Sequence, residues 1–126
     1  ALTRGPGRGP LKSEVPDGAT WLARSPGGTA SYDNIAFINT RMDRHVAPAG
    51  WAGLGVNSQP APNPVVPNAV SGWREYGSTD LAGVPLDLSR RVGGYLLHAD
   101  EVEAGFSTRA KVFAAFGAGE GWNPQP

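Results

Sequence analysis

Arg24 is the residue of this sequence best placed to do chemistry. It follows the short apolar run Trp21–Ala23 and precedes the strongest β-prone run of the chain, Ile35–Thr40. A strand fixes the backbone of such a residue, and its guanidinium then projects as a permanent, planar cation. We therefore take Arg24 as the main candidate for a charged functional group. The alternative is an ordinary surface or ion-paired arginine.

Two residues beyond that run are candidates for substrate binding. Met42 comes at the far end of the β-prone run, and Trp51 follows Pro48, Ala49 and Gly50. Methionine at such a position is often core filler. Tryptophan is either buried or offers a flat ring on which a sugar can stack. The residue types alone leave these alternatives open.

The sequence contains no clear set of residues for acid–base or nucleophilic catalysis. Three aspartates lie at turn positions, where this residue commonly bonds the local backbone: Asp17, Asp33 and Asp43. Glu75 stands beside aromatic residues, where we expect it to pair with an arginine or a backbone amide. His45 follows Asp43 closely, but no serine lies in a Gly-x-Ser-x-Gly turn. His45 and His98 are too far apart to suggest a metal site, so we expect no metal and no cofactor.

The composition excludes several classes of protein. The 126 residues include 18 glycines, 12 prolines and no cysteine, and the formal net charge is zero. Disulfides and thiol catalysis are therefore excluded. A balanced charge does not favour a nucleic-acid partner. No apolar run approaches the roughly 20 residues of a membrane span, and residues 1–20 do not resemble a signal peptide.

The order of turns and apolar runs predicts a loop-rich β protein with a helical end. Residues 1–20 read as a flexible Gly/Pro-rich segment or a partial coil, and residues 21–126 as the folded domain. Strands are expected at 21–23, 35–40 and 73–76, and a Pro-rich loop at 56–70. Continuous apolarity at 35–40 favours burial on both faces, as in a parallel sheet or a coiled β structure. Residues 99–115 have helical spacing of apolar residues, with a possible division near Ser107.

Several segments, in this order, resemble motifs of the pectinesterase (pectin methylesterase) family. They are Leu22–Arg24, Ala36–Val46, Pro48–Trp51, Trp73–Ser78, Arg91–Leu97, Glu101–Ala104, Phe106–Ser107 and Trp122–Pro124. The resemblance covers about residues 21–124 and suggests the C-terminal portion of such an enzyme. It implies an all-β fold, a right-handed parallel β-helix whose C-terminal coils end in a short helical cap.

The resemblance also implies an activity and an environment. Members of the family are secreted or periplasmic hydrolases that act on methyl esters of polygalacturonate without a metal. Arg24 would be the arginine that holds a nucleophilic aspartate charged and oriented, which a neighbouring guanidinium does well. Met42 would line the substrate cleft. The implied partner is the polysaccharide pectin, with no nucleic acid and no membrane, and the full-length protein would be monomeric.

The sequence departs from the family pattern at two positions and over one segment. Ala23 replaces the glycine before the motif arginine, and Pro26 replaces the tryptophan after it. Nothing in residues 1–20 matches the segments that carry the family's two aspartates. We therefore expect these 126 residues alone to be inactive, as a fragment of the enzyme. The alternative is a non-catalytic carbohydrate-binding or structural β-solenoid.

Overall fold

The computed structural model describes residues 1–5, 15–24, 34–52, 67–114 and 121–122, and the account below concerns these residues. They form five strands, a 3₁₀ turn and two helices. The strands are β1 (Ala23–Arg24), β2 (Asn34–Ile38), β3 (Trp51–Ala52), β4 (Gly72–Tyr76) and β5 (Tyr95–Leu96). The 3₁₀ turn is η1 (Leu88–Arg90), and the helices are α1 (Ala99–Phe106) and α2 (Arg109–Val112).

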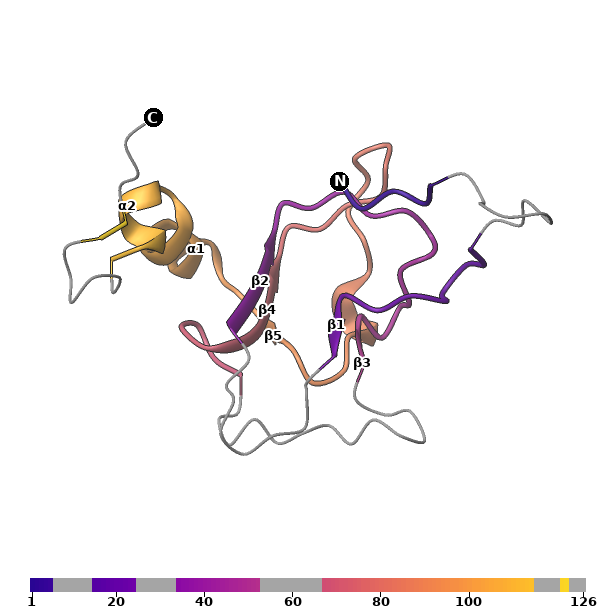
Figure 1. The fold of residues 1–126 in the computed structure, drawn as a ribbon, viewed down its shortest axis with the longest axis horizontal. Coiled ribbons are helices and arrows are strands. Elements are labelled where there is room, and N and C mark those ends of the chain that lie inside the picture. The colour runs from indigo at the N-terminus through magenta and orange to yellow at the C-terminus, as the bar shows by residue number, and fades with distance from the viewer. Residues whose placement is uncertain (6–14, 25–33, 53–66, 115–120, 123–126) are drawn as a thin grey trace.

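The strands form two parallel sheets. The larger has the order β2-β4-β5, and the smaller pairs β1 with β3 (Figure 1). β2 and β4 are aligned over five residues each, with Phe37 opposite Glu75. The rich supply of aromatic and β-branched residues in β2 explains why this pair is the longest.

The N-terminal residues continue the parallel arrangement beyond the strands. Leu2 donates its N–H to the carbonyl of Arg41 and accepts from Asp43, while Met42 donates to Thr79. Residues 1–5 therefore run beside residues 41–43, which in turn run beside Thr79. This lateral contact brings Arg4 within reach of Asp43, 39 positions away in the sequence.

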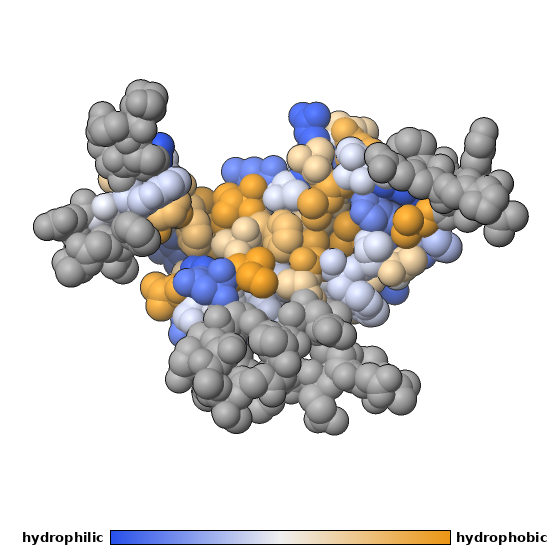
Figure 2. All heavy atoms as spheres, in the orientation of Figure 1, coloured by the Kyte–Doolittle hydropathy of each residue, from blue (hydrophilic) through white to orange (hydrophobic). Residues whose placement is uncertain are grey.

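The core lies between and beside the sheets and is small. Its buried apolar residues are Met42, Ala47, Trp51, Trp73 and Leu97. The indoles of Trp51 and Trp73 stack with centroids 5.5 Å apart and planes 5° apart, and Phe37 packs obliquely on Trp51 at 5.8 Å. Such contacts stabilise by about 0.5–1.5 kcal/mol each beyond the area they bury. Figure 2 shows apolar residues gathered across the middle of the molecule.

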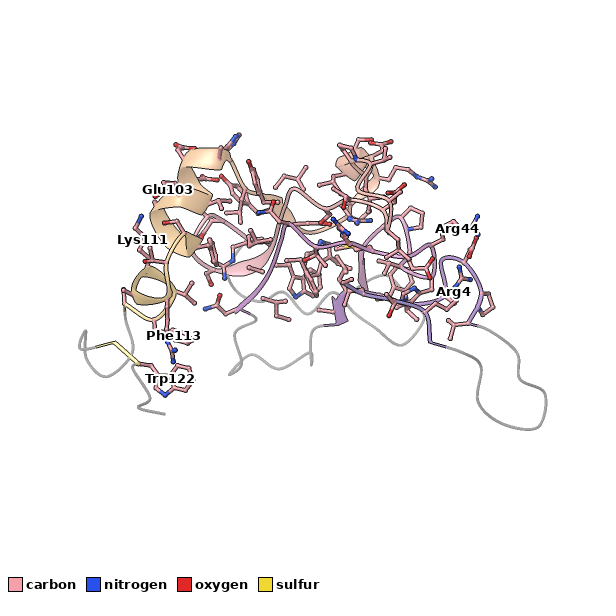
Figure 3. All side chains as sticks on the ribbon, turned by 90° about the horizontal axis from the view of Figure 1, so that it is seen from above. Arg4, Arg44, Glu103, Lys111, Phe113 and Trp122 are labelled. Carbon is pink, nitrogen blue, oxygen red and sulfur yellow. The ribbon has the colours of Figure 1, made fainter. Side chains whose placement is uncertain are left out.

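The C-terminal part forms two short helices in place of one continuous helix. Glu101 accepts from the N–H of His98 at 2.8 Å and from the hydroxyl of Tyr95 at 2.7 Å, which fixes the start of α1 against β5. The expected division near Ser107 is present, but Thr108 caps α2 by accepting the N–H of Lys111. Figure 3 places the helices at the opposite end of the molecule from Arg4 and Arg44.

The prediction of an all-β right-handed parallel β-helix with a helical cap is wrong. The described residues contain only a three-stranded and a two-stranded parallel sheet with two short helices, a small mixed α/β arrangement without a solenoid. Continuous apolarity indicates a strand covered on both faces, and it does not say what covers it. The run at 35–40 is only half-buried in β2, and β4 is the buried strand of this sheet. Trp51 stacks on Trp73 of β4, and Phe106 of α1 lies near Arg74 of the same strand.

Candidate functional site

A buried ion pair lies at the centre of the described structure. Arg91 donates from Nε to Oε2 of Glu75 at 2.8 Å and from Nη2 to Oε1 at 3.0 Å. The side chain of Arg91 is 5% exposed and that of Glu75 is fully buried. The planar guanidinium thus meets the carboxylate through two parallel hydrogen bonds, the strongest geometry that such a pair adopts.

The same guanidinium holds three neighbouring segments together. Its Nη1 donates to the carbonyls of Pro48 at 2.8 Å and Ala47 at 3.3 Å, and its Nη2 lies 3.7 Å from the sulfur of Met42. Arg91 therefore ties β4 to the segment 42–48 as well as balancing the charge of Glu75. Removing it would leave a carboxylate and two carbonyls without their donor.

Two glycines make room for these side chains. A Cβ on Gly50 would lie 2.8 Å from Nε of Arg91, and the φ of Gly50 is +74°, a conformation that side chains disfavour. A Cβ on Gly94 would lie 2.9 Å from Cδ1 of Trp51. The glycines before β3 and β5 are thus required by the close approach of Arg91 and Trp51.

An open groove of about 510 Å³ lies beside this ion pair. Its walls combine acids and arginines with a few apolar residues. The lining residues are Asp17, Gly18, Met42, Asp43, Arg44, Val46, Pro48, Asp80, Leu86, Asp87, Arg90 and Arg91. A groove with apolar patches and several fixed polar groups can bind a polar ligand in a defined orientation.

A network of charges forms one end of the groove. Arg4 contacts Asp17 at 2.8 Å and Asp43 at 3.3 Å, and Arg44 lies 3.7 Å from Asp17. Figure 3 shows Arg4 and Arg44 at this end of the molecule. The side chain of Arg44 is 81% exposed, so its guanidinium is available to an anionic ligand.

Asp43 is fixed in its charged form by this network. The backbone N–H of Arg44 donates to its Oδ1 at 2.7 Å, and Arg4 adds a second donor, which together lower the pKa of Asp43 below its usual value of 3.8. A carboxyl whose pKa is depressed on folding stabilises the folded state at pH values above the unfolded pKa. That contribution is lost as the pH falls through the folded pKa.

The Asp43→Asn variant is therefore expected to be less stable than the native chain at neutral pH. Because the variant lacks the titrating carboxyl, its free energy of unfolding should fall less than that of the native chain when the pH is lowered below 3.8. Arg4→Gln should have a partial effect, because the backbone N–H of Arg44 remains. Urea unfolding between neutral and acid pH measures both. Parallel acid profiles for the native chain and Asp43→Asn would contradict this assignment.

Of the three site residues proposed from the sequence, one lines the groove, one lies in the core, and one has a side chain outside the described part. The backbone of Arg24 lies in β1 opposite Ala52, and its side chain lies outside the described part, so its role stays a prediction. Met42 lines the groove but is only 2% exposed. Trp51 is also 2% exposed and lies in the core against Trp73, so of its two interpretations the structure favours burial.

Sequence reasoning proposed none of the groove arginines Arg44, Arg90 and Arg91 as a site residue, although Arg44 and Arg91 lie in segments that resemble the family motifs. Glu75 was expected to pair with an arginine, and it does, but its partner lies 16 positions further along. Nothing in the periodicity of either segment identifies that partner. The consecutive arginines 90 and 91 after a Pro-Leu-Asp-Leu turn were the only available signal.

The described residues show no metal-binding cluster, and the groove aspartates all have structural contacts. Within those ranges, no group of three or more His, Asp or Glu side chains lies close enough to hold a metal ion. Each groove aspartate has a structural contact: Asp80 accepts from the N–H of Val84 at 2.9 Å and Asp87 from that of Ser89 at 3.0 Å. The described helices include none long and apolar enough to cross a bilayer.

The fold and the site together define a small mixed α/β domain with a charged groove over a buried Arg–Glu pair. No protein-family model, no curated protein and no solved structure matches the chain. The resemblance to pectinesterases therefore rests on the motifs in the sequence.

Proposed function

We propose that this chain forms part of the substrate groove of a pectinesterase-like carboxylic ester hydrolase acting on methyl esters of polygalacturonate. The observation that supports the proposal is the convergence of residues from separate motifs. Arg91 contacts both Glu75 and Met42, and Arg91 and Met42 line the groove. Gly50, which directly precedes Trp51, is in close contact with Arg91.

The charges of the groove suit a partly methylated uronate polymer. Free galacturonate carboxylates are anions that the exposed guanidinium of Arg44 and the neighbouring Arg90 can bind through paired hydrogen bonds. The oxygens of the groove aspartates can accept hydrogen bonds from sugar hydroxyls. Methyl esters, being neutral, would occupy the apolar stretches near Val46, Pro48 and Leu86.

The catalytic part of the proposal depends on residues outside this sequence. Aspartates in the roles of nucleophile and general acid–base would come from elsewhere in a longer protein. Arg24 would orient the nucleophile, and β1 places its backbone beside Ala52, next to Trp51. Such an enzyme would be secreted or periplasmic, where the polymer is found.

A non-catalytic carbohydrate-binding role is the second candidate. The contacts of the groove aspartates favour this role, because each carboxylate is held by an ion pair or by a hydrogen bond from a backbone N–H. Carboxylates fixed in this way bind well and are poorly placed to transfer protons. The two candidates share the ligand and differ in turnover.

The binding test uses oligogalacturonates of defined methylation and isothermal titration calorimetry on the 126-residue chain. We expect Arg44→Ala combined with Arg90→Ala to weaken binding of the unmethylated oligomer about tenfold, because two charged hydrogen-bond donors are lost. Arg41→Ala is the matched control, since Arg41 is exposed and outside the groove. With a fully methylated oligomer the double substitution should have little effect. Equal losses in the control, or no binding at all, would refute the proposal.

Turnover separates the two candidates. The assay measures the methanol that a protein expressed from the longer reading frame releases from methylated polygalacturonate. Methanol release that Arg24→Ala strongly reduces would support the hydrolase. Binding without methanol release supports the carbohydrate-binding module. Full activity of Arg24→Ala removes Arg24 from the mechanism.

A further inference from the structure

A second cavity, of about 560 Å³, lies between the sheet and the helices. It shares no lining residue with the groove. Its walls are mostly apolar and come from β2, the segment before β4, β4 itself, α1 and α2. The lining residues are Asn34, Ala36, Ala69, Val70, Arg74, Gly105, Phe106, Lys111, Val112 and Ala114.

Arg74 is the charged group of this cavity and is 5% exposed. Its Nη1 donates to the carbonyl of Ala69 at 3.3 Å, and its Nη2 donates to Oδ1 of Asn34. The guanidinium carbon lies 5.1 Å from the centre of the Phe106 ring, in a cation–π contact. The buried Nε finds no hydrogen-bond partner among the described residues.

The charge of Arg74 is not balanced within the described part of the chain. None of the cavity's described lining residues is acidic. Lys111 adds a second positive charge, and its Nζ contacts Oε1 of Glu103 at 3.1 Å and the hydroxyl of Ser107 at 2.8 Å. A buried charge without a counter-ion is unfavourable, and burial lowers the pKa of Arg74 from its usual value.

Arg74 therefore differs from Arg91, the other buried arginine. Arg91 has a bidentate carboxylate partner and further hydrogen bonds to carbonyls. Arg74 has two neutral acceptors, an aromatic ring and a cavity. A bound anion would supply to Arg74 what Glu75 supplies to Arg91.

We propose that this cavity binds a small organic monocarboxylate with an apolar body, its carboxylate on Arg74 and its chain against Phe106, Val70 and Val112. The planar fork of an arginine matches a carboxylate. The apolar walls suit a hydrocarbon chain better than an inorganic anion, which would need more donors around it. This site is independent of the proposed polysaccharide groove.

The test is a titration of the 126-residue chain with hexanoate, followed by the amide NMR signals of Val70, Gly105 and Val112. Hexanamide is the neutral probe of the same shape, and sulfate is the inorganic anion. We expect saturable shifts with hexanoate. Binding of hexanamide and sulfate should be weaker by about tenfold or more, because a charge-assisted pair or the apolar contact is missing. No saturable shift with hexanoate, or equal affinity for hexanamide, would overturn the proposal.

Substitutions assign the site to Arg74. Arg74→Met keeps a long side chain without the charge and should weaken hexanoate binding about tenfold or more. Because Arg74→Met alters a buried residue, two alternative substitutions at a partly exposed position provide a second measurement. Val112 is 48% exposed, so Val112→Glu and Val112→Lys should both fold. Both variants remove an apolar contact of the ligand chain, and the glutamate variant also repels the carboxylate and competes for Arg74. Hexanoate should therefore bind the glutamate variant much more weakly than the lysine variant. Equal binding by Arg74→Met, or by both Val112 variants, would contradict the assignment.

Discussion

Replacing Glu75 with alanine is expected to lower the free energy of unfolding by about 3–5 kcal/mol. The carboxylate is fully buried and receives two hydrogen bonds from Arg91. Its removal leaves a buried guanidinium without a counter-ion, and the penalty for that charge exceeds the value of the lost contacts. Urea unfolding at neutral pH, followed by tryptophan fluorescence, measures the change.

An exposed ion pair of the same chain is the matched control for this substitution. Glu103 pairs with Lys111 at 3.1 Å, with side-chain exposures of 73% and 39%. Glu103→Ala should change stability little, since solvent screens such a pair. The double variant Glu75→Met with Arg91→Met should recover much of the loss, because it removes both charges together. If Glu75→Ala were as stable as Glu103→Ala, the pair would not be the structural centre described here.

Trp51→Ala is expected to lower the free energy of unfolding by about 3–5 kcal/mol, as is usual when a buried aromatic side chain is removed from a core. Trp51 is 2% exposed, stacks on Trp73 and also packs against Phe37. The affinity of the remaining folded protein for oligogalacturonate should be unchanged. Chemical denaturation and calorimetry under native conditions measure the two effects.

A second tryptophan of this chain provides the control. Trp21 is 51% exposed, so Trp21→Ala should change the free energy of unfolding by no more than about 0.5 kcal/mol. A Trp51→Ala variant with near-native stability and lost sugar affinity would reverse the conclusion. It would show that Trp51 is the stacking platform that its residue type also allows.

The local elements of this protein could largely be anticipated from its sequence. The runs at 35–40 and 73–76 were expected as strands and correspond to β2 and β4. The region 99–115 was expected to be helical, and α1 and α2 lie within it. These features depend on residue type and spacing over a few neighbours, where propensity and amphipathic period are strong. The expected strand at 21–23 was placed too early, since β1 is Ala23–Arg24. The strands β3 and β5 were missed because two residues carry no periodic signal.

The fold class and the pairing of charges could not be anticipated in the same way. An apolar run predicts a strand of a parallel sheet in a solenoid and in a small mixed α/β arrangement alike, so it could not decide between them, and the prediction of a solenoid was wrong. The contacts of Arg91 with Glu75 and Met42 join residues 16 and 49 positions apart. No short-range pattern encodes such a partner.

The sequence by itself therefore determined the two longest strands and the helical region, and it excluded thiol chemistry through the absence of cysteine. The tertiary structure alone decided that Arg91 is neutralised by Glu75, that the acceptors of Arg74 among the described residues are neutral, and that Trp51 is buried. The physical reason is one of range. Backbone preferences act between neighbours in the chain, whereas burial and charge balance depend on residues that only folding brings together.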